Sequence, residues 1–178
     1  MSRTPIRLLL LTLASVLVAV ALPATAQAAP YCGITWGSLA KHAGHNDPGS
    51  LGDEFRQARV GRHDCYDRLV LDIGGTTAVN SYRVEYVDKV RSDGSGFVVP
   101  LRGGAFLQIT VGAHDMTRTS VNPDVTGFRT FRQVAAAGYH EGLTSVGLGV
   151  RARLPFRVLT LAGPGDSVRV AIDVAHAW

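Results

Sequence analysis

The stretch DRLVLDI at residues 67–73 decides the fold class of this chain. Leu69, Leu71 and Ile73 alternate with Arg68, Val70 and Asp72, so the apolar side chains recur at every second position. Successive side chains of an extended chain point to opposite faces, and this period is typical of a strand with one buried face. The stretch therefore predicts a half-buried β-strand.

Similar patterns lie on both sides of this stretch. Further strands are predicted at residues 81–90, 96–104, 105–113, 140–150, 151–163 and 166–178. Pro100 interrupts the second of these, which favours an edge position. Residues 128–139 fit either a strand or a short helix, and Ser50 or Asp53 could cap a helical turn over residues 54–60. No long amphipathic helix is predicted, so we expect an all-β chain, a sandwich or a barrel, with little helix.

The pattern Arg-h-h-h-Asp-h, where h is apolar, occurs twice, as RLVLDI at 68–73 and RVAIDV at 169–174. Arg and Asp lie four residues apart in each copy and so share one strand face. We expect same-strand ion pairs, Arg68–Asp72 and Arg169–Asp173. If the echo is a true internal repeat, the two strands should hold equivalent places in two sheets.

Residues 1–28 have the form of a cleaved secretory signal peptide. An uncharged apolar run at 8–22 follows two arginines and precedes small residues, with cleavage expected after Ala26 or Ala28. No cysteine stands where a lipid anchor would attach, so we expect a secreted protein without a membrane anchor after cleavage. Two of the 18 basic residues and none of the 14 acids lie in this segment, which leaves a net charge of +2. That balance argues against a nucleic-acid-binding protein.

The two cysteines, Cys32 and Cys65, predict one disulfide, because thiols of secreted proteins are usually oxidised. It would tie a loop-rich segment, residues 29–66, to the first strong strand. The alternative is a metal site formed by His63, Asp64 and Cys65 with His42 or His45. The disulfide is the favoured interpretation, and we expect neither a metal nor a cofactor.

Catalytic motifs are incomplete. His140-Glu141 is not followed by the second histidine of a zinc hydrolase, and neither Ser95 nor Ser145 lies in the G-x-S-x-G elbow of a serine hydrolase. A cysteine nucleophile is unavailable if the two cysteines are paired. We therefore predict that the protein is not an enzyme.

Polar candidates for ligand binding are arginines and one histidine. Arg151, Arg153 and Arg157 would share one face of an extended chain and could pair with carboxylates or phosphates. Arg62 and His63 could make polar contacts to a glycan or a peptide carboxylate. The alternative for both groups is an ordinary solvated surface, with each side chain bonded to nearby protein groups.

Trp36 is the aromatic candidate, because it could stack on a sugar or pack over the disulfide. Tyr82, Tyr86 and Phe131 are expected in the core, and Trp178 is expected to cover an edge of the sandwich.

Several blocks in one order resemble the AMIN-like domain family, small secreted or lipid-anchored proteins typical of actinobacteria. The blocks are 32–41, 60–73, 82–96, 99–111, 127–138, 147–165 and 169–178, and the wider AMIN relationship rests mainly on the two Arg-h-h-h-Asp-h strands. The resemblance implies a β-sandwich of two small sheets, here over residues 67–178. AMIN domains accompany periplasmic N-acetylmuramoyl-L-alanine amidases and secretins, where they target peptidoglycan. We therefore expect a non-catalytic domain that binds cell-wall glycan or peptide, or else one that docks on another envelope protein.

Overall fold

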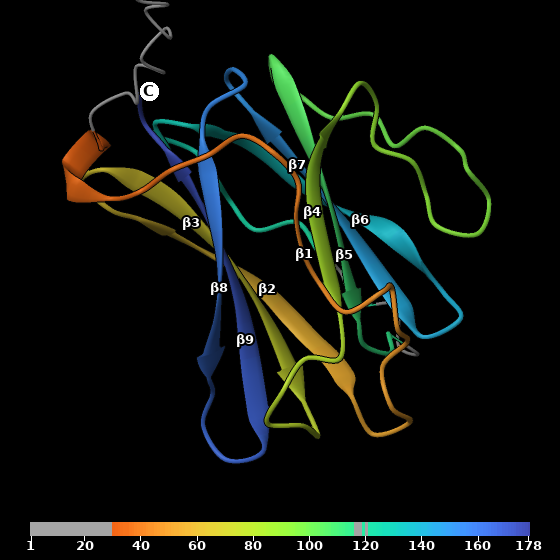
Figure 1. Ribbon diagram of the computed structural model, residues 1–178. Helices are drawn as coiled ribbons and strands as arrows, with labels where there is room; N and C mark the ends of the chain where they lie inside the picture. The colour runs from red at the N-terminus through yellow and green to blue at the C-terminus, as the bar shows by residue number, and fades with distance from the viewer. Residues whose placement is uncertain (1–29, 116–118, 120) are drawn as a thin grey trace, which may run out of the picture.

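A computed structural model describes residues 30–178, except 116–118 and 120, so the predicted signal peptide lies outside the described residues. Two antiparallel sheets pack face to face (Figure 1). One has the strand order β2 (Glu54–Arg62), β3 (Tyr66–Gly74), β9 (Ser167–Ala175), β8 (Phe156–Ala162). The other has the order β1 (Lys41–Ala43), β4 (Tyr82–Val87), β5 (Ala105–Gly112), β7 (Leu143–Val150), β6 (Phe131–His140). Among the described residues the one helix is the 3-10 turn η1 (Tyr31–Gly33), so the predicted all-β sandwich is confirmed.

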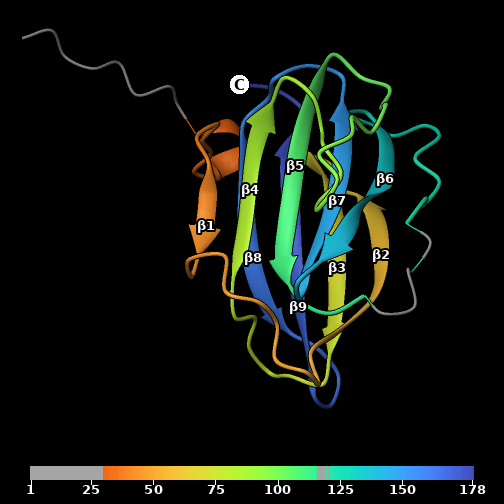
Figure 2. The same cartoon turned by 90° about the vertical axis from the view of Figure 1, so that its right-hand side faces the viewer.

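The core lies between the two sheets (Figure 2). From β3 it receives Leu69, Leu71 and Ile73, each 0% exposed, as the alternation predicts. Aliphatic side chains of β5, β7 and β9 meet them: Leu107, Ile109, Val146, Leu148, Val170 and Ile172. Because each fully buried aliphatic side chain contributes roughly 1.5–3 kcal/mol, this layer is the main source of stability.

The two Arg-h-h-h-Asp-h strands are neighbours in one sheet. In the antiparallel register of β3 and β9, Arg68 lies opposite Asp173 and Asp72 lies opposite Arg169. The expectation of equivalent places in two sheets is therefore wrong, and so are the same-strand ion pairs. Residues four apart on one strand are too distant to touch, whereas directly opposed residues have Cβ atoms about 5 Å apart.

Residues 54–60 form most of strand β2, so the predicted helical turn there is wrong. Phe55 is buried in the core, and the strand pairs with β3 along its length. Ser50 and Asp53 form a turn before the strand instead of capping a helix: the Asp53 carboxylate accepts a hydrogen bond from the Ser50 backbone N–H. Pairing with β3 outweighs the weak local preference for helix. Residues 128–139, where a strand and a helix were both open, hold β6, a strand with two register shifts.

Residues 96–104 form no strand, contrary to the prediction, although an Arg91–Val98 bridge and the hydrogen bond from the Gly104 N–H to the Val150 carbonyl hold the segment to its neighbours. The segment lies against β7, where a side chain at Gly147 would meet Leu101 at 2.7 Å and one at Gly149 would meet the Arg102 carbonyl at 1.9 Å. The glycines of β7 therefore allow close approach of a covering segment.

The aromatic predictions have mixed outcomes. Phe131 is 1% exposed, and Tyr82 and Tyr86 pack against the core while partly exposed. Trp178 is 64% exposed, so the prediction that it covers an edge is wrong.

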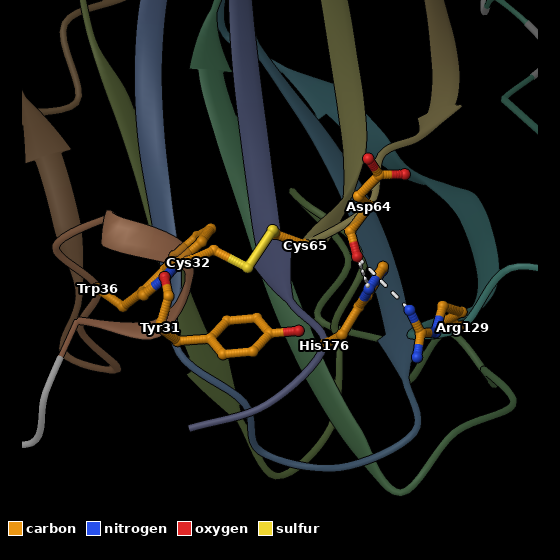
Figure 3. Close-up of a disulfide and its surroundings, with 7 residues drawn as sticks. All are labelled: Tyr31, Cys32, Trp36, Asp64, Cys65, Arg129 and His176. Atoms are coloured by element: carbon orange, nitrogen blue, oxygen red, sulfur yellow. Dashed lines mark hydrogen bonds between the residues drawn. A yellow bond between two sulfur atoms is a disulfide. The ribbon is translucent and has the colours of Figure 1, made fainter.

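The predicted disulfide between Cys32 and Cys65 is present and joins η1 to the turn between β2 and β3 (Figure 3). The Cys65 carbonyl accepts a hydrogen bond from the His176 backbone N–H, and the neighbouring Asp64 carbonyl accepts one from His176 Nδ1. The N-terminal segment is thus fastened to the end of β9. Nearby, the buried Asp67 carboxylate accepts the backbone N–H groups of Thr130 and Phe131, which ties β3 to the opposite sheet.

Replacing both Cys32 and Cys65 by Ser should lower the free energy of unfolding by roughly 3–4 kcal/mol, since the bond closes a loop with a sequence separation of 33. The check is urea unfolding followed by circular dichroism, with the reduced wild-type protein as a second sample. An unchanged midpoint would show that the tether contributes nothing to stability.

Candidate functional site

The outer face of the four-stranded sheet holds a depression of about 240 Å³. Its lining includes Gly61, Val70 and Leu161, which we call the apolar floor, and Arg59, Arg68, Arg169 and His63, which we call the rim. These side chains gather here because residues that face outward on β2, β3, β9 and β8 alternate with those that fill the core. We call this feature the outer-face depression.

Asp173 organises one side of this face. Its side chain is 0% exposed, and it accepts two hydrogen bonds from Arg68, Nε to Oδ1 at 2.6 Å and Nη2 to Oδ2 at 2.8 Å. Arg157 on β8 donates a third from Nε to Oδ2 at 2.8 Å. Hydrogen bonding to Asp173 raises the pKa of the Arg68 guanidinium above its usual value. One buried carboxylate thus fixes two guanidinium groups at the surface.

Aromatic rings continue the same face beyond Asp173. The His63 ring stacks on Tyr66 with centroids 4.5 Å apart, and Trp36 meets Tyr66 edge-on at 6.0 Å. The guanidinium carbon of Arg157 lies 5.3 Å from both the Trp36 and Tyr66 centroids, and that of Arg68 lies 5.3 Å from Tyr66. These distances are within the range of cation–π attraction.

The two remaining arginines close the rim. Arg59 on the edge strand β2 forms a bidentate pair with Asp72, and this hydrogen bonding raises the pKa of its guanidinium. Arg169 donates to the Ala162 carbonyl. Four arginines against two aspartates leave the face with an excess of positive charge.

Of the residues predicted to bind, His63, Trp36 and Arg157 meet on this face. Arg151 and Arg153 do not join Arg157 in a row, because β8 begins at Phe156. Arg151 donates to the His176 carbonyl. Arg153 lies 4.7 Å from the Tyr86 ring centre, on the other sheet.

Trp36 does more than pack near the disulfide: its indole Nε1 donates to the Tyr31 carbonyl at 2.9 Å, next to Cys32, while its ring contacts Arg157. Arg62 lies over the Phe128 ring at 5.8 Å, away from the outer-face depression.

The sequence prediction missed Arg59, Arg68 and Arg169 as site residues. Arg59 lay in a segment interpreted as helical, and the other two were assigned to same-strand ion pairs. The repeated Arg-h-h-h-Asp-h pattern was the signal that could have found them, once the two copies were aligned antiparallel.

The alternative metal site of His63, Asp64 and Cys65 would need a free Cys65 thiol, but Cys65 is bonded to Cys32. Among the described residues no three His, Cys, Asp or Glu side chains are grouped to hold a metal ion. In the same part of the chain, no helix is long and apolar enough to cross a membrane.

Comparison with the sequence models of known families identifies the family of the β-sandwich. The sequence model of the AMIN-like domain matches residues 53–176, which run from just before β2 to just after β9. The chain belongs to the AMIN-like domain family. This AMIN-like protein is thereby assigned to a family of cell-envelope domains. No curated protein and no solved structure matches it significantly.

Replacing Asp173 by Ala should cost about 2–3 kcal/mol of unfolding free energy, because it leaves two half-buried guanidinium groups without their shared carboxylate. Asp72→Ala is the matched control. The Arg59 side chain, which pairs with Asp72, is 48% exposed, so removing the Asp72 carboxylate should lower the free energy of unfolding by less than about 1 kcal/mol. Urea unfolding of both variants provides the measurement, and equal losses would contradict the role given to Asp173.

Stability should fall as the pH rises from about 10 to about 12. Burial raises the pKa of Tyr86 to about 12, and its hydroxyl donates to the Leu154 carbonyl. In this range the unfolded tyrosine ionises while the folded one stays neutral, so ionisation favours unfolding. Tyr86→Phe should remove this part of the pH dependence in urea unfolding. Identical pH profiles for the variant and the wild type would contradict the assignment.

Proposed function

We propose that this AMIN-like protein is a secreted, non-catalytic cell-envelope domain that binds peptidoglycan or other cell-wall material through the outer-face depression. The observation that carries the proposal is a rim of fixed guanidinium groups around an apolar floor. Such a face suits a ligand that combines anionic groups with short aliphatic parts.

The chemistry of wall polymers fits this face. Stem peptides carry carboxylates beside alanine-type side chains, and other wall polymers carry phosphates. Arg59, Arg68 and Arg169 already bond through Nε and Nη2 to Asp72, Asp173 and the Ala162 carbonyl, and their remaining N–H groups can donate to either anion. Val70 and Leu161 offer apolar contact below them. Because Asp72 and Asp173 already hold two of the guanidinium groups, little side-chain entropy is lost on binding.

The lining of the depression supports a binding role rather than a catalytic one. It consists of arginines, one histidine, aliphatic side chains and a glycine, and includes no carboxylate, hydroxyl or thiol nucleophile. His63 is stacked on Tyr66 rather than paired with such a group.

Secretion is supported by the disulfide and by the form of residues 1–28. The expected partner is therefore wall glycan or peptide.

A second candidate is docking on another envelope protein. It is favoured by β8, an edge strand whose one neighbouring strand among the described residues is β9, apart from a bridge between Phe156 and Gly37. A partner could add a strand along residues 157–162. Crosslinking in intact cells that gives a single dominant protein adduct would favour this candidate over wall binding.

The direct test is sedimentation of the purified, folded protein with isolated sacculi at several salt concentrations. The wild type should sediment, and the Arg59→Ser/Arg169→Ser variant should bind at least about tenfold more weakly, since each lost charge-assisted contact is worth about 1.5–3 kcal/mol. Arg83→Ser is the control, because Arg83 pairs with Glu85 on the other sheet.

Wild-type protein that stays in the supernatant even at low salt would overturn the proposal. Loss of binding in Arg151→Ser/Arg153→Ser instead would move the site to the other predicted arginines.

A further inference from the structure

A second cavity lies away from the outer-face depression, beside the edge strand β6. It measures about 410 Å³ and is lined by Arg102, Asn122, Asp124, Phe128, Arg132 and Gln133, among others. Figure 2 shows the segment that leads into β6 running along the side of the sandwich where β2 and β6 lie. We propose that this cavity, the Arg102 cavity, is a second binding site that takes an anionic sugar. The proposal does not depend on wall binding at the outer-face depression.

The wall of the cavity is built around one guanidinium group. Arg132 Nη1 donates to the carbonyls of Phe131, Phe128 and Arg129 at 2.8, 3.3 and 3.4 Å. These bonds hold the segment before β6 in a curl, so the cavity is formed by bonded backbone. The charge of Arg132 remains at the cavity lining.

Arg102 supplies a positive charge with which no other described residue pairs. Its backbone N–H donates to the Gln133 side-chain carbonyl at 2.9 Å, which fixes its position on the cavity rim. Its guanidinium group has no hydrogen bond or ion pair with any described residue. An exposed guanidinium group without a partner among the described residues is available to an anion.

The carboxylate in the lining does not cancel this charge. Asp124 Oδ1 accepts the Thr126 backbone N–H at 2.9 Å, and hydrogen bonding to Thr126 lowers the pKa of Asp124. Asp124 therefore stays ionised, but the lining holds two guanidinium groups, Arg102 and Arg132, against this one carboxylate, so its net charge is positive. Arg62 adds a third basic group: its guanidinium carbon lies 5.8 Å from the Phe128 ring, and a side chain at Gly127 would meet its Nη1 at 3.5 Å.

The uncharged lining narrows the ligand class. Asn122 and Gln133 present amide groups, and the lining is mainly polar, so hydroxyl groups of a ligand would find partners. The volume lies within the range of roughly 300–1,000 Å³ found for small-molecule sites. A sugar that bears a carboxylate or a phosphate satisfies both the charge and the hydroxyl partners, whereas a neutral sugar leaves Arg102 unpaired.

The test is a titration of the full folded protein, observed by NMR, with four probes: glucuronate, glucose 6-phosphate, glucose and inorganic phosphate. We expect saturable shifts of residues 122–133 with one or both anionic sugars, at an affinity at least about tenfold higher than for glucose or phosphate alone. The better of the two anionic sugars identifies the source of the negative charge.

Arg102→Ser should lower the affinity for the tighter-binding anionic sugar by about tenfold or more, because one charge-assisted contact is lost. Arg91→Ser is the matched control, since Arg91 is an exposed arginine that bonds to its own turn at the Gly96 carbonyl. Glucose binding equal to that of the anionic sugars, no saturable shift with any probe, or an unchanged affinity in Arg102→Ser would each overturn the proposal. Arg59→Ser/Arg169→Ser should leave these shifts intact, which separates this site from the outer-face depression.

Discussion

The antiparallel register of β3 and β9 is the constraint on which the rest of the structure depends. It sends Leu69, Leu71 and Ile73 inward against the other sheet, and it places Arg68 opposite Asp173 on the outer face. A slip of one residue would exchange these two faces, exposing the aliphatic layer and burying the charges. The core and the charged outer face are therefore two consequences of a single strand pairing.

The arrangement of side chains on the outer face follows from the pairing of β3 with β9. Asp173 is fully buried because Arg68 and Arg157 cover it from the two neighbouring strands, and the same guanidinium groups meet Tyr66 and Trp36. The disulfide brings the Trp36 segment to this side of the sheet, because Cys65 immediately precedes Tyr66. Local charge thus arises on a chain whose predicted mature net charge is only slightly positive.

The sequence predicted the strands whose faces differ in polarity, because alternation is local information. It could not place the partners: Arg59, Arg68 and Arg169 join one rim only through strand pairing, and β2 was mistaken for a helical turn because its partner β3 decides its conformation. Pro100 lies in a covering segment rather than a strand because Gly147 and Gly149 let that segment approach β7. The cavity beside β6 depends on backbone carbonyls held by Arg132, which no residue pattern reveals.

A double-mutant cycle on Arg68 tests the central register most directly, with unfolding free energy as the readout. The account predicts that Arg68 and Asp173 couple by about 1–3 kcal/mol when both are replaced by Ser. Arg68 and Asp72, four residues apart on the same strand, should be additive within about 0.5 kcal/mol. Coupling of Arg68 to Asp72 and not to Asp173 would contradict the β3–β9 register and the binding face derived from it.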